Sequence, residues 1–312
     1  MTTGDIVTLA GGVGAAKFLR GLIEVHDPRR CVAIVNVADD FHLHGLHISP
    51  DLDTVTYTLS DQVNPETGWG RVGESWSVLA ELERLGGETW FSLGDKDIAL
   101  HMFRTQRIAD GATLTEVTRE ITSAFGIAVD VIPVTNEPVE TKLTLTDNTE
   151  IDFQDYFVAR QHNVAVSAVR FRGADDATPA PRVLAAIDNA ETIVIAPSNP
   201  IVSIGPLLAV DGIKQRLIDN RDRVAAISPI VGGKALKGPA DRLLRELGHE
   251  ASVVGVARIY ADIAATLVID SVDEHHRDAV EATGLRCIVT DTVMSDVERS
   301  AALSCALLET LS

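Results

Sequence analysis

Short apolar runs rich in β-branched residues recur along the chain, and stretches with helical periodicity follow them. Near-continuous hydrophobicity of this kind is typical of strands that are buried on both faces of a parallel sheet. The runs predict strands at 6–10, 32–37, 192–196, 224–230, 253–256, 266–270 and 287–290. Helical patterns lie between several of them, at 15–25, 182–188, 212–220, 240–248 and 273–284. This alternation predicts a doubly wound, mainly parallel α/β sheet.

Two stretches depart from the alternation. Residues 59–126 are mostly helical in pattern, most clearly at 77–87 and 113–126. Residues 142–153 alternate apolar and polar side chains around Asp147-Asn148, which is the pattern of an antiparallel hairpin. We expect these stretches to form a cap over the sheet.

The domain organisation follows from these patterns. We expect a single domain over residues 1–312, with the helical and β-hairpin cap inserted at about 59–170. The segment 172–181 is the most linker-like part of the chain, because it combines Gly, Asp and Pro residues.

The acidic composition limits the classes of partner. The chain holds 27 Lys and Arg against 45 Asp and Glu in 312 residues, a formal net charge of −18. Coating a nucleic acid requires a basic face, so we expect no nucleic-acid partner. Phosphate ligands are still compatible with this charge, because backbone N–H groups, a few local cations or a carboxylate-bound metal can hold them.

The cysteines and the apolar runs indicate the compartment. Cys31, Cys287 and Cys305 are far apart and show no CxxC spacing, so neither a disulfide scaffold nor a thiolate zinc site is expected. The amino-terminal residues carry an early acid and no long apolar stretch, which argues against a signal peptide. No run of 18 apolar residues occurs, so no membrane partner is expected. Together these features predict a cytoplasmic protein.

The first predicted strand runs into a glycine turn, Gly11-Gly12-Val13-Gly14-Ala15-Ala16-Lys17. Glycines between a strand and a helix let a phosphate approach backbone N–H groups at the positive end of that helix. The pattern lacks the third small residue of a dinucleotide fingerprint, and it is not a Walker A loop. The alternative is a tight turn that simply requires small residues.

Acidic residues cluster after the second predicted strand. Asp39 and Asp40 follow it directly, and the SPDLDT segment adds Asp51 and Asp53. In an extended segment Asp51 and Asp53 would converge on one side, where Thr54 offers a hydroxyl. Carboxylate oxygens at the carboxyl ends of parallel strands suit Mg²⁺ bound together with substrate phosphates.

The same residues permit other interpretations. Asp53 could instead cap a helix that begins at Thr54. Three histidines, His42, His44 and His47, lie between these acids. They could be metal ligands, substrate contacts or simply polar residues of a loop.

A third cluster follows Leu93-Gly94. If a helix begins near Asp95, then Asp97, His101 and Arg104 lie on one face of it, at i, i+4 and i+7. Lys96 and Arg104 could hold a phosphate or carboxylate, and a solvated face with internal ion pairs is the alternative.

Two further loops follow strands. The segment 197–206 contains Ser198, Asn199, Ser203 and Gly205, which can present amides and hydroxyls to a nucleotide or phosphate. The segment 228–234 has the same kind of composition and ends in a basic residue, Lys234. Each segment could equally be only a rigid turn.

The motifs GGVGAAK, NVADD, SPDLDT, LGDKD, APSNPIVSIGP and SPIVGGKALKGPA occur in this order along the chain. In that order they resemble the 2-phospho-L-lactate transferase family, which includes the phosphoenolpyruvate transferase of deazaflavin coenzyme F-420 biosynthesis. The resemblance extends over essentially the whole chain. It implies a Rossmann-like fold, Mg²⁺ as cofactor and a homodimer.

The implied reaction moves a phosphorylated three-carbon acid, 2-phospholactate or phosphoenolpyruvate, from a guanosine diphospho-conjugate to the ribityl hydroxyl of the 8-hydroxy-5-deazaflavin riboside Fo, and GMP leaves. By resemblance, Asp39 and Asp53 are the metal-binding acids. The residues implied to contact Fo are Asp51, Asp53, Thr54, Ser92, Asp95, Lys96, His101 and Arg104. The nucleotide and its phosphates are assigned to Gly12, Gly14, Lys17, Ser198, Asn199, Ser203 and Gly205. Lys96 replaces a frequent Arg of the family, and Ser92 stands at a variable position.

An acid that orients or deprotonates the attacking hydroxyl completes the hypothesis, with Asp53 and Asp51 as the candidates. The rival interpretations are an NAD(P)-dependent oxidoreductase and a nucleotide-sensing regulator with no chemistry. The oxidoreductase predicts a small residue where the chain has Lys17, and a ribose-binding acid near Asn36.

Overall fold

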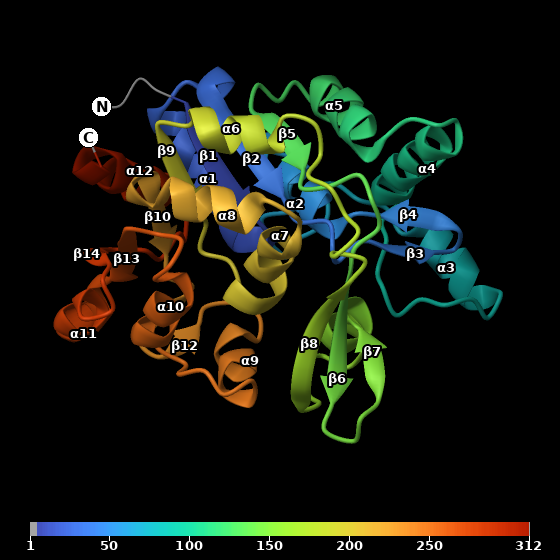
Figure 1. Ribbon diagram of the computed structural model, residues 1–312. Helices are drawn as coiled ribbons and strands as arrows, with labels where there is room; N and C mark the ends of the chain where they lie inside the picture. Colours follow the sequence, from blue (N-terminus) through green and yellow to red (C-terminus); the bar gives the residue numbers. More distant parts are fainter. Residues whose placement is uncertain (1–4, 312) are drawn as a thin grey trace.

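Seven parallel strands form the central sheet of the computed structural model, which describes residues 5–311 (Figure 1). The sheet order is β14-β13-β10-β9-β1-β2-β5, and all neighbouring strands are parallel. The strands are β1 (Ile6–Ala10), β2 (Cys31–Val35), β5 (Asp130–Pro133), β9 (Thr192–Ile195), β10 (Val224–Ile227), β13 (Thr266–Asp270) and β14 (Arg286–Thr290). The predicted α/β class with a mainly parallel, Rossmann-like sheet is confirmed.

Helices cover both faces of the sheet. On one face, α1 (Gly12–Val25) packs against α2 (Pro50–Leu59) and α12 (Val297–Leu311). On the other face, α6 (Val183–Asn189) and α8 (Ile213–Asp219) pack together in front of the strands in Figure 1. Because helices cover both faces, both sides of each central strand are shielded from water. Every residue of β1, β9, β10 and β13 is accordingly buried.

The carboxyl ends of four neighbouring strands, β1, β2, β9 and β10, lie at the same edge of the sheet because the strands are parallel. The segments that leave this edge are the glycine turn, 36–40, 196–204 and 228–239. Ligands of doubly wound sheets bind at such an edge.

One predicted strand is wrong: residues 253–256 form the first turn of α10 (Val253–Tyr260). The Ser252 hydroxyl accepts hydrogen bonds from the N–H groups of Val254 (3.2 Å) and Gly255 (3.1 Å), and this cap begins a helix. A short apolar run does not distinguish a buried strand from a buried helix.

Other boundaries differ for local reasons. The predicted strand 224–230 divides at Pro229, because proline cannot donate to a ladder; β10 ends at Ile227, and a small hairpin of β11 (Ile230–Val231) and β12 (Lys234–Ala235) follows. Strand β5 and helix α12 are absent from the predicted set.

Residues 59–170, the range expected for the cap, contain parts of three different structures. Strand β5 lies inside 59–170 and pairs with β2, so it belongs to the central sheet. Before it come α3 (Ser77–Arg84), α4 (Asp95–Ala109) and α5 (Leu114–Ala124), together with the hairpin of β3 (Phe41–Leu43) and β4 (Leu46–Ile48). After it comes a separate three-stranded antiparallel sheet, which projects from the bottom of Figure 1.

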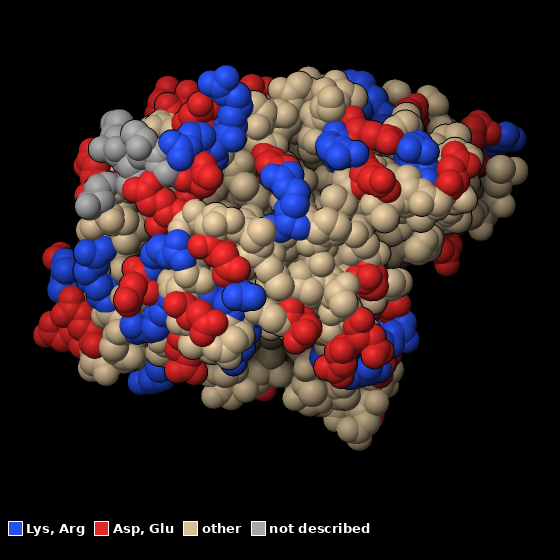
Figure 2. All heavy atoms as spheres, turned by 45° about the horizontal axis from the view of Figure 1, so that its top comes forward, with Lys and Arg blue, Asp and Glu red and all other residues tan. Residues whose placement is uncertain are grey.

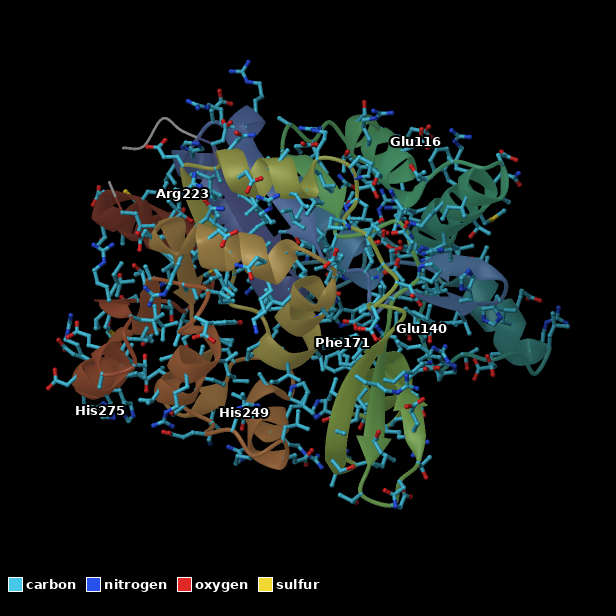
Figure 3. The ribbon with its side chains drawn as sticks, in the orientation of Figure 1. Glu116, Glu140, Phe171, Arg223, His249 and His275 are labelled. Atoms are coloured by element: carbon cyan, nitrogen blue, oxygen red, sulfur yellow. The ribbon has the colours of Figure 1, made fainter. Side chains whose placement is uncertain are left out.

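The predicted hairpin at 142–153 is confirmed as β6 (Glu140–Leu145) and β7 (Glu150–Asp152). Strand β8 (Val166–Arg172) adds a third strand beside β6. The segment 172–181 packs more closely than a linker, because Ala174, Ala177 and Ala180 are buried in the main core. In Figure 3, Phe171 marks the place where β8 approaches α7.

The remaining elements are η1 (Pro28–Arg30), η2 (Asp155–Ala159), η3 (Pro200–Ile204), α7 (Gly205–Ala209), η4 (Arg221–Arg223), α9 (Ala240–Glu246), η5 (Ser271–His276) and α11 (Arg277–Glu281). Acidic and basic side chains intermix over the face shown in Figure 2. Among residues 5–311, no helix has the length and apolarity needed to cross a bilayer. Residues 1–4, on which the expectation about a signal peptide partly depends, lie outside the described residues.

Candidate active site

The glycine turn brings a carboxylate to the positive end of α1. The Gly12 N–H donates a hydrogen bond to Asp51 Oδ1 (2.9 Å), so Asp51 stabilises the first turn of the helix. Gly14 has a different function: a Cβ at this position would overlap the carbonyl oxygen of Pro197. Small residues are therefore required here for the close packing of two loops, whatever ligand the turn binds.

Asp51 connects the two central strands of the site. Its Oδ2 accepts a hydrogen bond from the side-chain amide of Asn36 (3.0 Å), which directly follows β2. Burial raises the pKa of Asp51 to about 6 and the charge of Asp40 adds to this, whereas the hydrogen bonds from Asn36 and Gly12 lower it. A carboxyl with this pKa can exchange a proton near neutral pH.

Asp39 is the least compensated acid of the site. It is 6% exposed, and its Oδ1 atom has no hydrogen-bond partner among the described residues. Burial raises its pKa well above the ordinary value of 3.8, the nearby carboxylates of Asp51 and Asp40 raise it further, and the Thr141 side chain opposes this increase. A buried, unpaired carboxylate is costly unless a cation or a proton compensates it.

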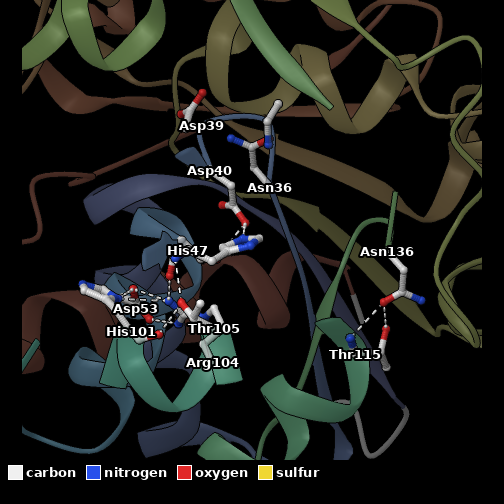
Figure 4. A network of polar contacts seen from close by, with 12 residues as sticks. Asn36, Asp39, Asp40, His47, Asp53, His101, Arg104, Thr105, Thr115 and Asn136 are labelled. Atoms are coloured by element: carbon white, nitrogen blue, oxygen red, sulfur yellow. Dashed lines mark hydrogen bonds and ion pairs between the residues drawn. The ribbon is translucent and has the colours of Figure 1, made fainter. Parts of the chain in front are cut away.

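Asp53 lies in a buried ion pair with Arg104, which Figure 4 shows beside His101. Both terminal nitrogens of Arg104 face the Asp53 carboxylate; the Nη1···Oδ2 distance is 3.2 Å and the second contact is closer. Arg104 Nη1 also lies 3.2 Å from His101 Nδ1. Burial lowers the pKa of His101 to about 4, so the imidazole is neutral at pH 7 and can accept this hydrogen bond.

The expected convergence of Asp51 and Asp53 is wrong. Helix α2 begins at Pro50, so both residues are in its first turns, where positions two apart point roughly 200° away from each other. Asp51 therefore faces the glycine turn and Asp53 faces α4. The alternative that Asp53 caps the helix is also wrong, because Ser49 precedes the first helical residue.

A second carboxylate of the acidic loop also has a histidine partner. Asp40 Oδ2 accepts a hydrogen bond from the Ser49 hydroxyl (2.7 Å) and lies 3.0 Å from His47 Nε2. Burial raises the pKa of Asp40, and His47 and Ser49 oppose this increase. Of the three loop histidines, His47 is thus the one that the fold connects to the acids.

The predicted face of α4 is confirmed, since Asp97, His101 and Arg104 are all buried on it. Asp95 and Lys96 have local partners. The Asp95 carboxylate accepts hydrogen bonds from the Ser75 hydroxyl (2.6 Å) and the Val78 N–H (3.0 Å), and Lys96 Nζ donates to the Val72 carbonyl (2.7 Å). Both residues therefore hold the segment before α4. Whether they also contact a ligand stays a prediction.

Ser92 and Thr54 are less constrained. Ser92 is exposed in the loop before α4, and Thr54 is half-buried in α2. No described contact tests the role predicted for either residue.

The loop after β9 is tied to the glycine turn. The Ser198 hydroxyl donates to the Gly11 carbonyl (2.7 Å), and Asn199 Oδ1 accepts from the Ile201 N–H (2.9 Å). A Cβ at Gly11 would lie 2.8 Å from Ser203 Cβ, and a Cβ at Gly205 would lie 2.9 Å from the Phe171 ring. Ser198 and Ser203 therefore lie against the glycine turn, whereas Gly205 faces Phe171 of β8.

Sequence reasoning missed Asn36 and Tyr57. Asn36 was noted only as the end of a strand, although a polar residue at that place is a signal in a parallel sheet. Tyr57 faces inward from α2, near Asp97, and no polar pattern revealed it.

Of the two predicted metal ligands, Asp39 and Asp53, only Asp39 has an oxygen that no described residue hydrogen-bonds and that is therefore free for a metal ion. Asp39 offers an unpartnered carboxylate oxygen, as a hard divalent cation requires. Both oxygens of Asp53 contact Arg104. Within residues 5–311 no three His, Cys, Asp or Glu side chains are grouped so as to hold a metal. Mg²⁺ here would therefore depend on Asp39 together with substrate oxygens and water.

Asp97→Asn is expected to make the protein less sensitive to rising pH. Burial raises the pKa of Asp97 to about 6, above its ordinary 3.8, and Glu74 and Asp53 add to this while the Tyr57 hydroxyl opposes it. The unfolded chain therefore releases this proton first, and stability falls as pH rises from about 4 to about 6. The asparagine side chain of the variant cannot ionise, so the variant avoids a loss of about 1–3 kcal/mol in the free energy of unfolding. Urea unfolding of both proteins at pH 4.5 and pH 8 measures the difference.

Asp147→Asn is the matched control, because Asp147 is exposed in the β6–β7 turn. An Asp97→Asn protein that loses as much stability as the wild type between the two pH values would contradict the inferred cost of ionising Asp97.

Comparison with known proteins identifies the family. A family model described as 2-phospho-L-lactate transferase CofD matches residues 6–309. A phosphoenolpyruvate transferase from Kitasatospora aureofaciens is 42% identical over 305 residues, which cover 96% of this chain and 95% of that protein. A 2-phospho-L-lactate transferase from Methanosarcina mazei is 36% identical over 299 residues, which cover 96% of this chain and 98% of that protein.

The fold has a solved counterpart. The crystal structure of a protein from Bacillus halodurans matches with a TM-score of 0.66 and 18% sequence identity, over 98% of this chain and all of that one. At this identity the likeness concerns the fold alone. The family match over nearly the whole chain and the identity to full-length relatives show that the chain belongs to the 2-phospho-L-lactate transferase CofD family.

Proposed function

We propose that the protein transfers a phosphorylated three-carbon acid from its guanosine diphospho-conjugate to the ribityl hydroxyl of Fo, with release of GMP, in coenzyme F-420 biosynthesis. Membership of the family makes the chain a transferase. It disfavours the oxidoreductase and the regulator that the glycine turn alone left open. The donor, the acceptor and the metal are our proposal.

The observation that carries the proposal is the buried carboxylate of Asp39, whose Oδ1 has no hydrogen-bond partner among the described residues, together with Asp51 at the glycine turn. The phosphate oxygens of a phosphoryl transfer carry negative charge throughout the reaction, so the buried carboxylate of Asp39 would be unfavourable beside them without a cation. We therefore assign Asp39 as a ligand of Mg²⁺. When bound, the ion supplies charge neutralisation for the phosphate oxygens.

The chain's own residues supply orientation and a proton acceptor. In the transfer, the acceptor oxygen forms a bond to the phosphorus that carries the acid, the bridging P–O bond breaks, and GMP leaves with the bond electrons. The hydroxyl proton passes to Asp51, whose pKa of about 6 suits a base near neutral pH. Asp53 is held by Arg104, so its carboxylate has a fixed orientation toward α4. We assign it to positioning the acceptor.

The acid is proposed to be phosphoenolpyruvate. Relatives named phosphoenolpyruvate transferase are 39–42% identical to the chain, and the 2-phospho-L-lactate transferases from two Methanosarcina species are 36% identical. The test is incubation with Fo, Mg²⁺ and each guanylylated acid in turn, followed by mass spectrometry. We expect GMP and the phosphoenolpyruvyl phosphodiester. Formation of neither product from any donor would reject the function.

Asp39→Asn is expected to lower kcat/KM by about 100-fold or more, because the neutral amide no longer compensates a divalent cation. The loss should be largest at low Mg²⁺ and should not be restored at saturating Mg²⁺. Steady-state rates of GMP release across a Mg²⁺ titration measure it. Asp147→Asn, the same chemical change at the exposed hairpin turn, is expected to keep wild-type rates. Wild-type turnover by Asp39→Asn would remove Asp39 from the site.

The homodimer stays part of the proposal. Light scattering of the purified chain tests it, since a dimer doubles the 33.4 kDa mass.

A further inference from the structure

The small antiparallel sheet is anchored on the loop that carries Asp39. In β6, the Thr141 N–H donates a hydrogen bond to the Ala38 carbonyl (2.8 Å). The side-chain amide of Gln154, just after β7, donates to the carbonyl of Asp39 itself (3.3 Å). In Figure 3, Glu140 marks this end of the small sheet, which faces the main body of the molecule. The main-chain carbonyls of two consecutive loop residues are thus held by a segment distant in the sequence.

The same loop is held from the other side by Asn36. The Asn36 side chain accepts a hydrogen bond from the Ala38 N–H (2.9 Å) and donates one to Asp51 Oδ2 (3.0 Å). Gln154 is itself buried, with 6% of its surface exposed. The backbone from which the Asp39 carboxylate projects is therefore fixed between the central sheet and the small sheet.

The hydroxyl of Thr141 is a second buried oxygen without a partner. Thr141 is 2% exposed, and its Oγ1, like Asp39 Oδ1, has no hydrogen-bond partner among the described residues. The Thr141 side chain also lowers the pKa of Asp39, as a hydroxyl beside a carboxylate does. Unpaired oxygens are costly in a protein interior. One hard divalent cation compensates both, because carboxylate and hydroxyl oxygens are ligands that Mg²⁺ accepts.

We propose that Thr141 supplies a further oxygen ligand to the divalent cation at Asp39, and that Gln154 is a positioning residue that fixes the main chain of Asp39. The inference rests on the proposed function for the presence of that cation. None of the motifs that carry the family resemblance includes either residue. The small sheet therefore contributes to the site as well as to a hydrophobic cluster of its own.

Thr141→Val tests the ligand, because valine keeps the shape of threonine and removes the hydroxyl. Binding of Mn²⁺ to the full chain is measured by electron paramagnetic resonance of the free ion, with and without GDP, and a titration of GDP alone gives the Mn²⁺ bound by the nucleotide. We expect Thr141→Val to weaken Mn²⁺ binding by about 10- to 100-fold and Thr141→Ser to retain most of it.

The metal-free stability of Thr141→Val provides a second readout. The substitution removes a buried hydroxyl that has no partner, so the free energy of unfolding in urea should equal or exceed that of the wild type. A hydroxyl with a merely structural role would give the opposite result, a less stable protein with unchanged affinity for Mn²⁺.

Gln154→Met tests the positioning residue, because methionine has a similar length and no N–H donor. The variant should require about 10-fold more Mg²⁺ for half-maximal GMP release and keep a kcat near that of the wild type at saturating Mg²⁺. It should also bind Mn²⁺ more weakly. An unchanged Mg²⁺ requirement and unchanged Mn²⁺ binding would remove this role from Gln154.

Thr8→Val is the matched control. Thr8 is fully buried in the middle of β1, where its backbone is paired with Ala33 and Val194, and its hydroxyl also has no partner among the described residues. The same chemical change inside the central sheet should leave Mn²⁺ binding at the wild-type level.

The outcomes separate this inference from the proposed function. If Thr141→Val binds Mn²⁺ as tightly as the wild type, or if Thr8→Val weakens binding equally, Thr141 is not a ligand, even where the wild type forms the phosphodiester product. Absence of Mn²⁺ binding by the wild type under both conditions also rejects the inference. If binding depends on Thr141 while no donor is turned over, the cation site stands and the proposed reaction fails.

Discussion

Arg104→Met is expected to lower the free energy of unfolding by about 3–5 kcal/mol. Arg104 and Asp53 are 2% and 5% exposed, so methionine would leave the Asp53 carboxylate buried without its partner. Asp40 would also lose a nearby positive charge. Urea unfolding at pH 7 measures the change, and GMP release measures the loss of activity that accompanies a displaced Asp53.

The double variant Asp53→Asn/Arg104→Met is the decisive control. It removes both charges, so it should be more stable than Arg104→Met alone, and the cycle isolates the coupling between the two side chains. If Arg104→Met costs less than about 1 kcal/mol, or if the double variant is less stable than the single one, the pair is not a buried ion pair of the kind inferred.

The sequence predicted those parts of the fold that depend on local patterns. The apolar run 6–10 followed by glycines and a helical period predicted β1, the turn and α1, because each of these elements is encoded within a few consecutive residues. The same holds for the face of α4, since Asp97, His101 and Arg104 have helical spacing.

The errors arise where residues outside the apolar run determine its structure. The run at 253–256 is as apolar as a strand, and the cap at Ser252 makes it helical. Strand β5 is only four residues long, and it is part of the sheet because it pairs with β2. Neither the cap nor the pairing partner can be read from an apolar window alone.

The site shows the same division. The sequence shows which acidic residues form the cluster, but it does not show in which direction each side chain points. Whether Asp51 and Asp53 point together or apart depends on whether 50–59 is extended or helical. Once it is helical, Asp51 reaches the Gly12 N–H and Asn36, and Asp53 reaches Arg104, 51 positions along the chain. Long-range partners of this kind assign different tasks to two neighbouring aspartates.

Gly14→Ala is expected to lower the free energy of unfolding by roughly 3 kcal/mol or more and to abolish most of the activity. The added methyl group would overlap the carbonyl oxygen of Pro197, a backbone atom that cannot rotate away. Either α1 or the loop after β9 must move, and the Ser198–Gly11 hydrogen bond between the two segments would be strained. Urea unfolding and the rate of GMP release measure the two effects.

Gly111→Ala is the matched control, because a Cβ there would meet nothing within 4 Å and only the positive φ of 94° is strained. That strain costs about 1–2 kcal/mol without touching the site, so this variant should be mildly destabilised and fully active. Equal stability losses in the two variants would mean that Gly14 is required for its backbone and not for the contact with Pro197. A Gly14→Ala protein of normal stability that has lost only donor binding would instead identify Gly14 as a contact of the phosphate.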